Sequence, residues 1–240
     1  MTAIVGEIPG VVAREALSAS QSDEMFALLS RHFEGVTRAQ FDRDLAEKNW
    51  VVELRREGAL VGFSTLLATA ARFDDEPITV IYSGDTIVAP EAWGSPALAR
   101  TWIAAVNRLR EDRPGQRCYW LLLTSGFRTY RFLPVFWREF FPRHDAATPA
   151  ATSRLLRQLA RERYGAAFDE TTGVVRFAAP QRLRPLLAGV PAGREADADV
   201  AFFLARNPGH EDGDELVCLT EISEENLTAA GQRMVRAATR

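Results

Sequence analysis

The sequence predicts an α/β (α+β) domain in which helices flank a mixed, mostly antiparallel central sheet, and three observations support this class. First, three apolar segments, 50–56, 60–67 and 78–88, follow one another with short polar turns between them, as expected for neighbouring antiparallel strands. Second, residues 118–123 form an unbroken apolar run, which is typical of a central strand covered on both faces. Third, apolar residues at helical spacing follow Ser95-Pro96, and proline suits the first position of a helix.

The two helices expected near the N-terminus have recognisable start signals. Ser22 is expected to cap the first, because Asp23 and Glu24 follow it in the first turn, where the helix dipole favours negative charge. Thr37 and Gln40 form a capping-box pattern for the second. The sequence therefore predicts two helices ahead of the three antiparallel strands.

The C-terminal half has weaker signals, and prolines and glycines between residues 180 and 199 predict a surface excursion there. The expected elements are an aromatic-rich helix at 127–141 ended or kinked by Pro134, an arginine-rich helix at 153–164, a short strand at 174–177, a hairpin of strands 200–206 and 215–222, and a helix at 227–237. With a first strand at 11–17, we expect a single domain over 1–240, with a core at 11–145, an excursion at 146–199 and a C-terminal hairpin and helix at 200–240.

Composition and charge exclude several classes of function. The net charge is −3, from 29 basic and 32 acidic residues, so no overall charge favours nucleic acid or an anionic membrane. Lys48 is the only lysine, and Cys118 and Cys218 lie in apolar runs typical of buried, reduced thiols. No signal peptide, apolar span of about 20 residues or Cys/His zinc spacing is present. We therefore expect a cytoplasmic protein with no nucleic-acid partner, membrane span or metal site.

The order of elements, together with residues 87–98, resembles the GNAT N-acyltransferases. The stretch Ile-Val-Ala-Pro-Glu-Ala-Trp-Gly-Ser-Pro-Ala-Leu is similar to the family's Val-x-Pro-Glu-x-Arg-Gly-x-Gly-x-Gly/Ala loop, which binds the pyrophosphate of coenzyme A at a helix N-terminus. Gly94 keeps one family position, whereas Trp93, Pro96 and Leu98 depart from the pattern. The resemblance covers roughly residues 11–143.

The resemblance also implies a donor site between two strands, 80–88 and 118–125, that splay apart. The expected donor-binding residues are Ile87, Val88, Trp93, Gly94, Ser95, Ala97, Leu98 and Ser125. The implied co-substrate is an acyl-CoA or the phosphopantetheine of an acyl carrier protein, with no permanently bound cofactor. The implied acceptor is a primary amine on a small molecule or peptide.

Transfer of an acyl group from a thioester to an amine requires a base, a stabilised oxyanion and an acid. Asp85 is a candidate base, because a carboxylate inside an apolar strand has its pKa raised by desolvation. His32 and His210 are alternative bases. The resemblance implies that the Val88 N–H stabilises the oxyanion and that Tyr130 is the acid, although the family's Asn-x-x-Ala-x-x-x-Tyr spacing is not kept.

Each candidate has a structural alternative, and so does the function. Tyr130 can be a core aromatic, Asp85 a hydrogen-bonded strand residue, and Glu53 a second carboxylate that faces water. His144 is expected at the surface. The function expected first is an N-acyltransferase, and the alternative is a non-catalytic GNAT-like binding domain that has lost its donor site. Residues 150–240 are an alternative oligomerisation lobe, with a homodimer as one assembly.

Overall fold

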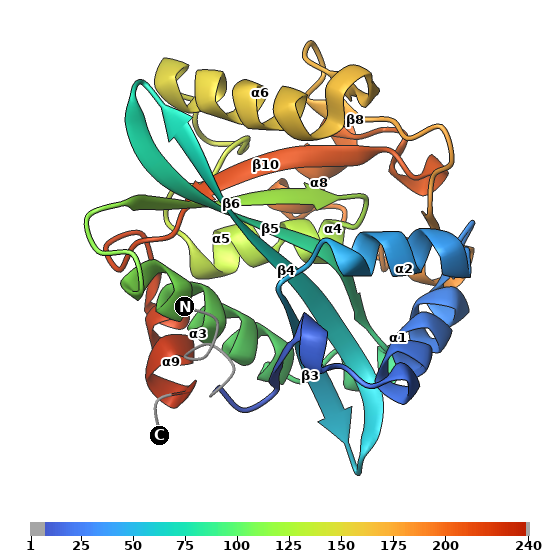
Figure 1. Cartoon of the computed structure of the whole chain (residues 1–240). Helices are drawn as coiled ribbons and strands as arrows, with labels where there is room; N and C mark the ends of the chain where they lie inside the picture. The colour runs from blue at the N-terminus through green and yellow to red at the C-terminus, as the bar shows by residue number, and fades with distance from the viewer. Residues whose placement is uncertain (1–7, 239–240) are drawn as a thin grey trace.

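The computed structural model describes residues 8–238 and places a mixed sheet at the centre of the molecule (Figure 1). Within the described residues this sheet has eight strands, in the order β1 (Val11–Ala13), β3 (Trp50–Arg56), β4 (Ala59–Phe73), β5 (Glu76–Val88), β6 (Arg117–Thr124), β10 (Glu215–Glu221), β8 (Val174–Val175) and β7 (Phe168–Asp169). Among these paired neighbours, only β5 and β6 are parallel. The expected mixed, mostly antiparallel sheet is confirmed.

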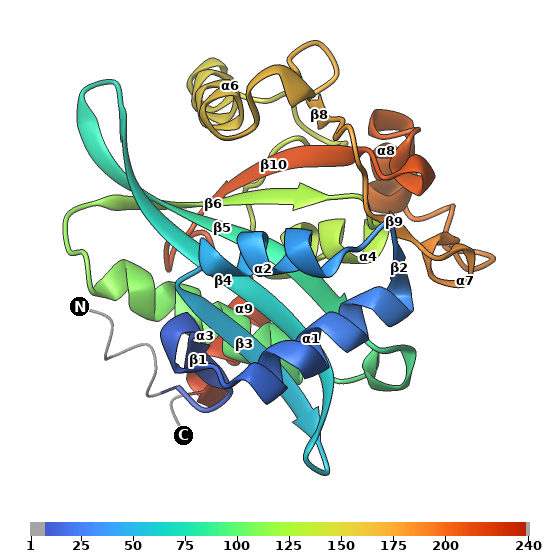
Figure 2. The same cartoon turned by 45° about the vertical axis from the view of Figure 1, so that its right-hand side comes forward.

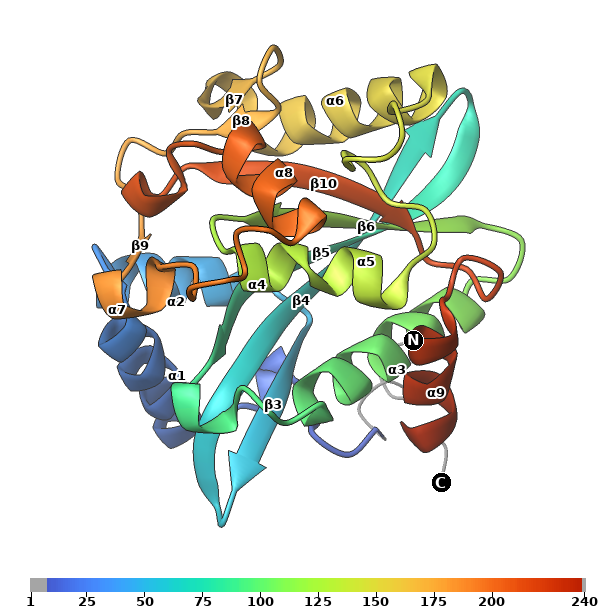
Figure 3. The same cartoon turned by 180° about the vertical axis from the view of Figure 1, so that it is seen from behind.

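Helices cover both faces of this sheet. One face carries α1 (Ala19–His32), α2 (Arg38–Ala46) and α6 (Ala150–Tyr164) (Figure 1). The other carries α3 (Ala97–Glu111), α4 (Phe127–Tyr130), α5 (Phe132–Phe136), α8 (Ala198–Arg206) and α9 (Ala229–Ala238) (Figure 3). Side chains of β6 alternate between the two cores, since Trp120 and Leu122 pack under α3 and Leu121 and Leu123 pack under α6.

Local signals in the sequence account for the N-terminal elements. Helix α1 begins earlier than expected, because Ser18 and Gln21 form a complete capping box ahead of Ser22. The predicted cap at Thr37 is confirmed, since its Oγ1 accepts a hydrogen bond from the Gln40 N–H at 3.2 Å. Strand β1 is shorter than the expected 11–17 and gives way to a 3₁₀ turn at Arg14–Ala16.

Two expectations for the later elements are wrong. Residues 200–206 form helix α8 and not a strand, because Asp197 caps the segment and Val200 and Phe203 are buried at helical spacing. Residues 127–141 form two short helices, α4 and α5, and the chain is extended from Trp137. Pro134 lacks the N–H that would bond to the carbonyl of residue 130, which removes a helical hydrogen bond across the boundary between α4 and α5 and fits the expected kink.

The expected surface excursion has a specific position. Its strand β9 (Arg182–Leu183) pairs with β2 (Phe33–Glu34), directly after α1, and helix α7 (Pro185–Ala188) follows. Figure 2 shows this segment beside the end of α1, near the carboxyl ends of β5 and β6. Residues far apart in the sequence therefore meet at one end of the sheet.

Candidate active site

Strands β5 and β6 part from each other beyond Ser83. Their parallel pairing begins at Ile78 and Arg117 and stops at Ser83 and Leu122, although β5 continues to Val88. In the β4–β5 register, Gly84 and Asp85 stand opposite Thr65 alone. This β-bulge bends β5 and increases its twist. The bulge therefore explains why the two parallel strands open into a cleft.

The bulge also decides which way Asp85 faces. Ahead of it, Ile81 packs on the α3 side of the sheet, whereas Ile87 beyond it packs against α1 and α2. In a regular strand, two residues an even number of positions apart face the same side. Ile81 and Ile87 face opposite sides, so the extra residue of the bulge reverses the alternation of β5. Asp85 lies on the same face as Ile87, toward α1, α2 and α6.

Glycine at the first position of this bulge leaves room for the side chains of Lys48 and Thr65. A Cβ atom on Gly84 would lie 2.7 Å from Lys48 Cε and 2.7 Å from Thr65 Oγ1. Real Cβ atoms do not approach other atoms this closely, so any larger residue forces the bulge or the lysine to move.

The parted strands enclose a cavity of about 570 Å³, a size suited to a small-molecule ligand. Its walls come from β5, β6, the loop before α3, helix α4 and the segment around α7. Lining residues with polar or aromatic side chains include Tyr82, Asp85, Trp93, Ser95, Ser125, Arg128, Thr129, Arg131, Arg194 and Glu215. Apolar lining residues include Ile87, Val88, Leu98, Leu123, Phe127, Leu183 and Leu187.

Two carboxyl groups share this cavity. Burial raises the pKa of Asp85 to about 6, against the opposing effect of Lys48. Burial raises the pKa of Glu215 to about 8, and the charge of Asp85 adds to the rise. Glu215 alternates with Val217 and Leu219, which pack under α6, so it faces the same side as Asp85. At neutral pH the pair therefore retains a proton.

Lys48 lies directly behind the bulge. It is 5% exposed, and its Nζ donates to the Asp44 carbonyl oxygen at 2.8 Å and lies 5.5 Å from the Tyr82 ring centroid. Burial lowers the pKa of Lys48, and the charge of Asp85 opposes that change. The sequence signal for this residue was its being the only lysine in a chain that otherwise uses arginine. Glu215 carried no comparable signal.

Three segments meet at the α3 side of the cavity. The Trp93 indole donates to the Val88 carbonyl oxygen at 2.8 Å, and the Arg128 guanidinium lies 4.1 Å from the indole ring centroid. Arg128 also donates to the Leu187 carbonyl oxygen at 2.9 Å. Trp93 and Arg128 thus connect the loop before α3 to α4 and α7 across the opening between β5 and β6.

The expected donor residues divide into two groups. Ile87, Val88, Trp93, Ser95, Leu98 and Ser125 line the cavity, whereas Gly94 and Ala97 do not. Ala97 N–H donates to Ser95 Oγ at 3.3 Å. Ala89 N–H bonds to the Val61 carbonyl oxygen at 2.8 Å, so in the alternating ladder the Val88 N–H points away from β4, toward the opening.

The other expected catalytic residues lie outside the cavity. Tyr130 is buried, and its hydroxyl donates to the Pro142 carbonyl oxygen at 2.9 Å. His32 is buried with Nδ1 2.8 Å from the Leu28 carbonyl oxygen. The His210 ring packs 5.7 Å from the Phe203 ring. The carboxylate of Glu53 pairs with Arg55 at 2.9 Å. Of the expected acid–base groups, the structure brings only Asp85 into the cavity.

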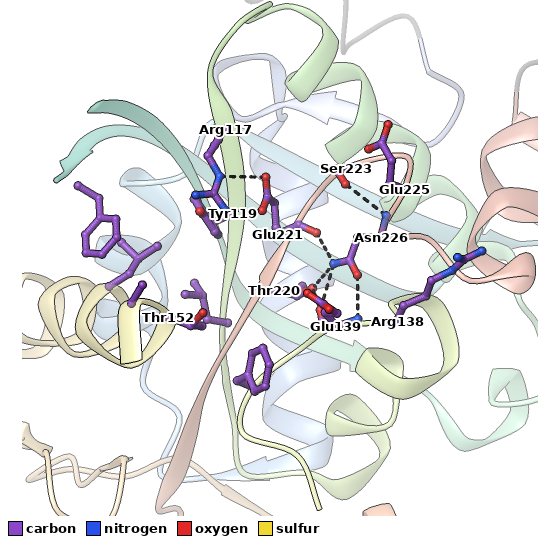
Figure 4. Close-up of a pocket in the computed structure, with 15 residues that line it drawn as sticks. Arg117, Tyr119, Arg138, Glu139, Thr152, Thr220, Glu221, Ser223, Glu225 and Asn226 are labelled. Atoms are coloured by element: carbon purple, nitrogen blue, oxygen red, sulfur yellow. Dashed lines mark hydrogen bonds and ion pairs between the residues drawn. The ribbon is translucent and has the colours of Figure 1, made fainter. Parts of the chain in front are cut away.

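A second cavity, of about 410 Å³, lies at the opposite end of β6 (Figure 4). Its polar groups bond to one another. Arg117 Nη2 lies 2.6 Å from Glu221 Oε2, and the Asn226 side chain donates to the Glu139 and Glu221 carbonyl oxygens at 3.0 and 2.7 Å (Figure 4). Arg117, Glu221 and Asn226 are thus held in contacts with one another and with the backbone.

Within residues 8–238, no cluster of three or more His, Cys, Asp or Glu side chains is arranged to hold a metal ion. In the same described part, no helix combines the length and apolar character needed to cross a membrane.

The sheet order, the parallel β5–β6 pair and the cleft between them agree with the mixed, mostly antiparallel sheet and the splayed strands that the resemblance to GNAT enzymes implies. No protein-family model matches the sequence, and no curated protein matches it. Several solved structures resemble this chain at low sequence identity.

Among these structures is a probable N-acyltransferase of unknown function from Enterococcus faecalis, with 15% identity and a TM-score of 0.42 over 54% of this chain and 32% of that one. This chain therefore spans about a third of that protein. Another is a GNAT family N-acetyltransferase from Escherichia coli in complex with CoA, with 16% identity and a TM-score of 0.37 over 51% of this chain and 66% of that one. A third is an aminoglycoside 6′-N-acetyltransferase complexed with coenzyme A, with 10% identity and a TM-score of 0.41 over 89% and 97% of the two chains.

Proposed function

We propose that the chain is an N-acyltransferase that moves an acyl group from a phosphopantetheine thioester to a primary amine. The observation that carries this proposal is the cleft itself. Two parallel strands part at a β-bulge, and the bulge turns a carboxylate with a raised pKa into the space between them. An extended pantetheine chain fits such a cleft, because the separated strand edges offer unpaired N–H and C=O groups.

The charges that line the cavity fit this pair of substrates. Arg128 and Arg131 lie on the α3 face, where a phosphate of the donor would enter, and Asp85 and Glu215 lie on the α6 face. An acceptor amine arrives as an ammonium ion and is attracted to the carboxylates. The donor is coenzyme A or a carrier-protein phosphopantetheine.

In the proposed reaction, the Asp85 carboxylate takes a proton from the acceptor ammonium, which frees the nitrogen lone pair. The amine attacks the thioester carbonyl carbon, and the Val88 N–H donates a hydrogen bond to the oxyanion that forms. Collapse of the tetrahedral intermediate forms the amide and breaks the carbon–sulfur bond. A base of pKa near 6 is mostly ionised at neutral pH and suits the first step.

The decisive experiment measures binding and turnover of acyl-CoA thioesters of increasing chain length, with acyl carrier protein thioesters in parallel. Ser125 lines the cleft and is half-buried, so Ser125→Trp fills the space between the strands. Ser20→Trp, on the exposed surface of α1, is the matched control. We expect saturable binding and amide formation in the native chain and in the control, and loss of both in Ser125→Trp.

A second candidate function is a non-catalytic GNAT-like binding domain. It is favoured by two hydrogen bonds within the donor loop. The Trp93 indole N–H donates to the Val88 carbonyl oxygen, and the Ala97 N–H donates to Ser95 Oγ, so these backbone groups already have partners from the chain itself. Failure of every CoA and carrier-protein thioester to bind at millimolar concentration would support this alternative and contradict the acyltransferase.

A further inference from the structure

We propose that Glu215 is the general acid of this reaction and that it forms a proton-exchanging pair with Asp85 across the end of β6. The inference rests on the proposed acyl transfer and deepens it. Tyr130, the acid implied by the family resemblance, lies outside the cavity with its hydroxyl bonded to Pro142. The cavity therefore needs another group to protonate the leaving thiolate.

Strand geometry places the two carboxyl groups on either side of the end of β6. The last β6–β10 pair is Thr124 with Leu216, so Glu215 lies one residue beyond it. Asp85 lies two residues beyond Ser83, the last β5 residue paired with β6. Both side chains face α6 and line one cavity. Strand β6 ends at Thr124, and its pairing with β5 ends two residues earlier, at Leu122.

The surroundings of Glu215 keep it protonated. In the described residues, no hydrogen bond or ion pair holds its carboxyl group, while the preceding Asp214 pairs with Arg176 at 3.0 Å. The charged and titratable groups that face this region are Asp85 and Tyr82 on β5, Asp44 on α2, Lys48 behind the bulge, and Arg163 and Tyr164 on α6. Arg163 stacks 4.0 Å from the Tyr82 ring and lies 3.3 Å from Glu47.

The proton balance closes with these two groups. Asp85 takes one proton from the acceptor ammonium, and the attacking nitrogen loses its second excess proton to solvent as the amide forms. The protonated Glu215 gives its proton to the departing thiolate, which leaves as a thiol. The proton on Asp85 then passes to the Glu215 carboxylate, which restores the starting state of the pair.

Leaving-group chemistry tests the role of Glu215. The rates are measured with acetyl-CoA and with S-(4-nitrophenyl) thioacetate, using n-butylamine as acceptor. An alkyl thiolate needs a proton to leave, whereas the nitrophenyl thiolate does not. We expect Glu215→Gln to slow transfer from acetyl-CoA by about 100-fold and transfer from the aryl thioester by less than about threefold, because only the first step needs the acid.

The matched control is Glu221→Gln, which changes a carboxylate on the same strand that pairs with Arg117 outside the cleft. It should leave both rates unchanged. An equal loss on the two thioesters in Glu215→Gln would overturn the role of Glu215 while leaving the acyltransferase proposal intact. If the native chain neither binds nor transfers from any CoA or carrier-protein thioester, the acyltransferase proposal fails, and the acid role fails with it.

The coupling between Asp85 and Glu215 can also be measured without a substrate. Carboxyl ¹³C chemical shifts of the free protein, followed from pH 4 to 10, report the titration of each side chain. In Asp85→Asn the titration midpoint of Glu215 should fall, because the neighbouring charge is gone. An unchanged midpoint would overturn the pair.

Discussion

The two cavities at the ends of β6 differ in how their polar groups are satisfied. The cleft at the Thr124 end has a volume of about 570 Å³ and contains two carboxyl groups for which no ion pair with another described residue is seen. The cavity at the Arg117 end has a volume of about 410 Å³, and two of its charged groups, Arg117 and Glu221, form an ion pair at 2.6 Å. The volumes are of the same order, so volume does not distinguish a reactive site from a structural one.

The backbone explains this difference. At the Arg117 end, β6 is paired with β5 on one side, from Ile78 onward, and with β10 on the other, up to Glu221. At the Thr124 end, β5 has turned away at its bulge, and only β10 remains paired. A loss of strand pairing creates room for a ligand and leaves backbone N–H and C=O groups unpaired. It also places the buried carboxyl groups of Asp85 and Glu215 beside this space.

The largest expected effect is the loss of acyl transfer when a carboxyl group of the Thr124-end cleft is replaced. Asp85→Asn should lower kcat/KM for acyl transfer by about 10²–10⁴-fold, because it removes the proposed base. In the native chain, kcat/KM should rise as the pH increases through about 6, where Asp85 ionises. Steady-state kinetics from pH 5 to 8 measure both effects. A native level of activity in Asp85→Asn would refute the role of this residue.

The next largest effect concerns the stability of the bulge. Gly84→Val should destabilise the fold by about 1–3 kcal/mol, because the added atoms meet Lys48 and Thr65. Gly94→Val is the matched control, since a Cβ there meets nothing within 4 Å. Urea denaturation compares the two variants. Equal midpoints would show that the bulge tolerates a side chain.

A smaller effect is the pH dependence that Glu215 gives to stability. Its pKa is about 8 in the folded chain and about 4.3 when unfolded, so the folded state binds more protons between these values and stability falls as the pH rises. Glu215→Gln should remove this loss and stabilise the fold at pH 8.5 by about 1–2 kcal/mol, with little change at pH 4. Urea denaturation at both pH values measures it, and a gain confined to pH 4 would have the wrong sign.

The smallest effect is expected in the second cavity. Arg117→Ala removes an ion pair in which the arginine side chain is 60% exposed, and it should cost about 0.2–1 kcal/mol. Acyl transfer should stay at the native rate. A large loss of transfer in this variant would connect the two cavities and end the contrast between them.

The sequence by itself determined the features that depend on neighbouring residues. The cap at Thr37, the long strands 50–56 and 78–88 and the buried run at 118–123 follow from local pattern, and the structure confirms them. Asp85 was also visible as a carboxylate within an apolar strand. Each of these features depends on a few neighbouring residues. The spacing of apolar residues, or one polar side chain in an apolar run, is therefore enough to reveal it.

Only the tertiary structure decided what surrounds Asp85. Three features surround it: the bulge that turns its side chain, the buried Lys48 and the facing Glu215. Lys48 lies between α2 and β3, whereas Glu215 is the first residue of β10, 167 residues later in the chain. Helix α8 replaced an expected strand because a cap and buried helical spacing prevailed over strand-forming residues. The pKa of a carboxyl group depends on the charges and the burial around it, and these are properties of the folded chain.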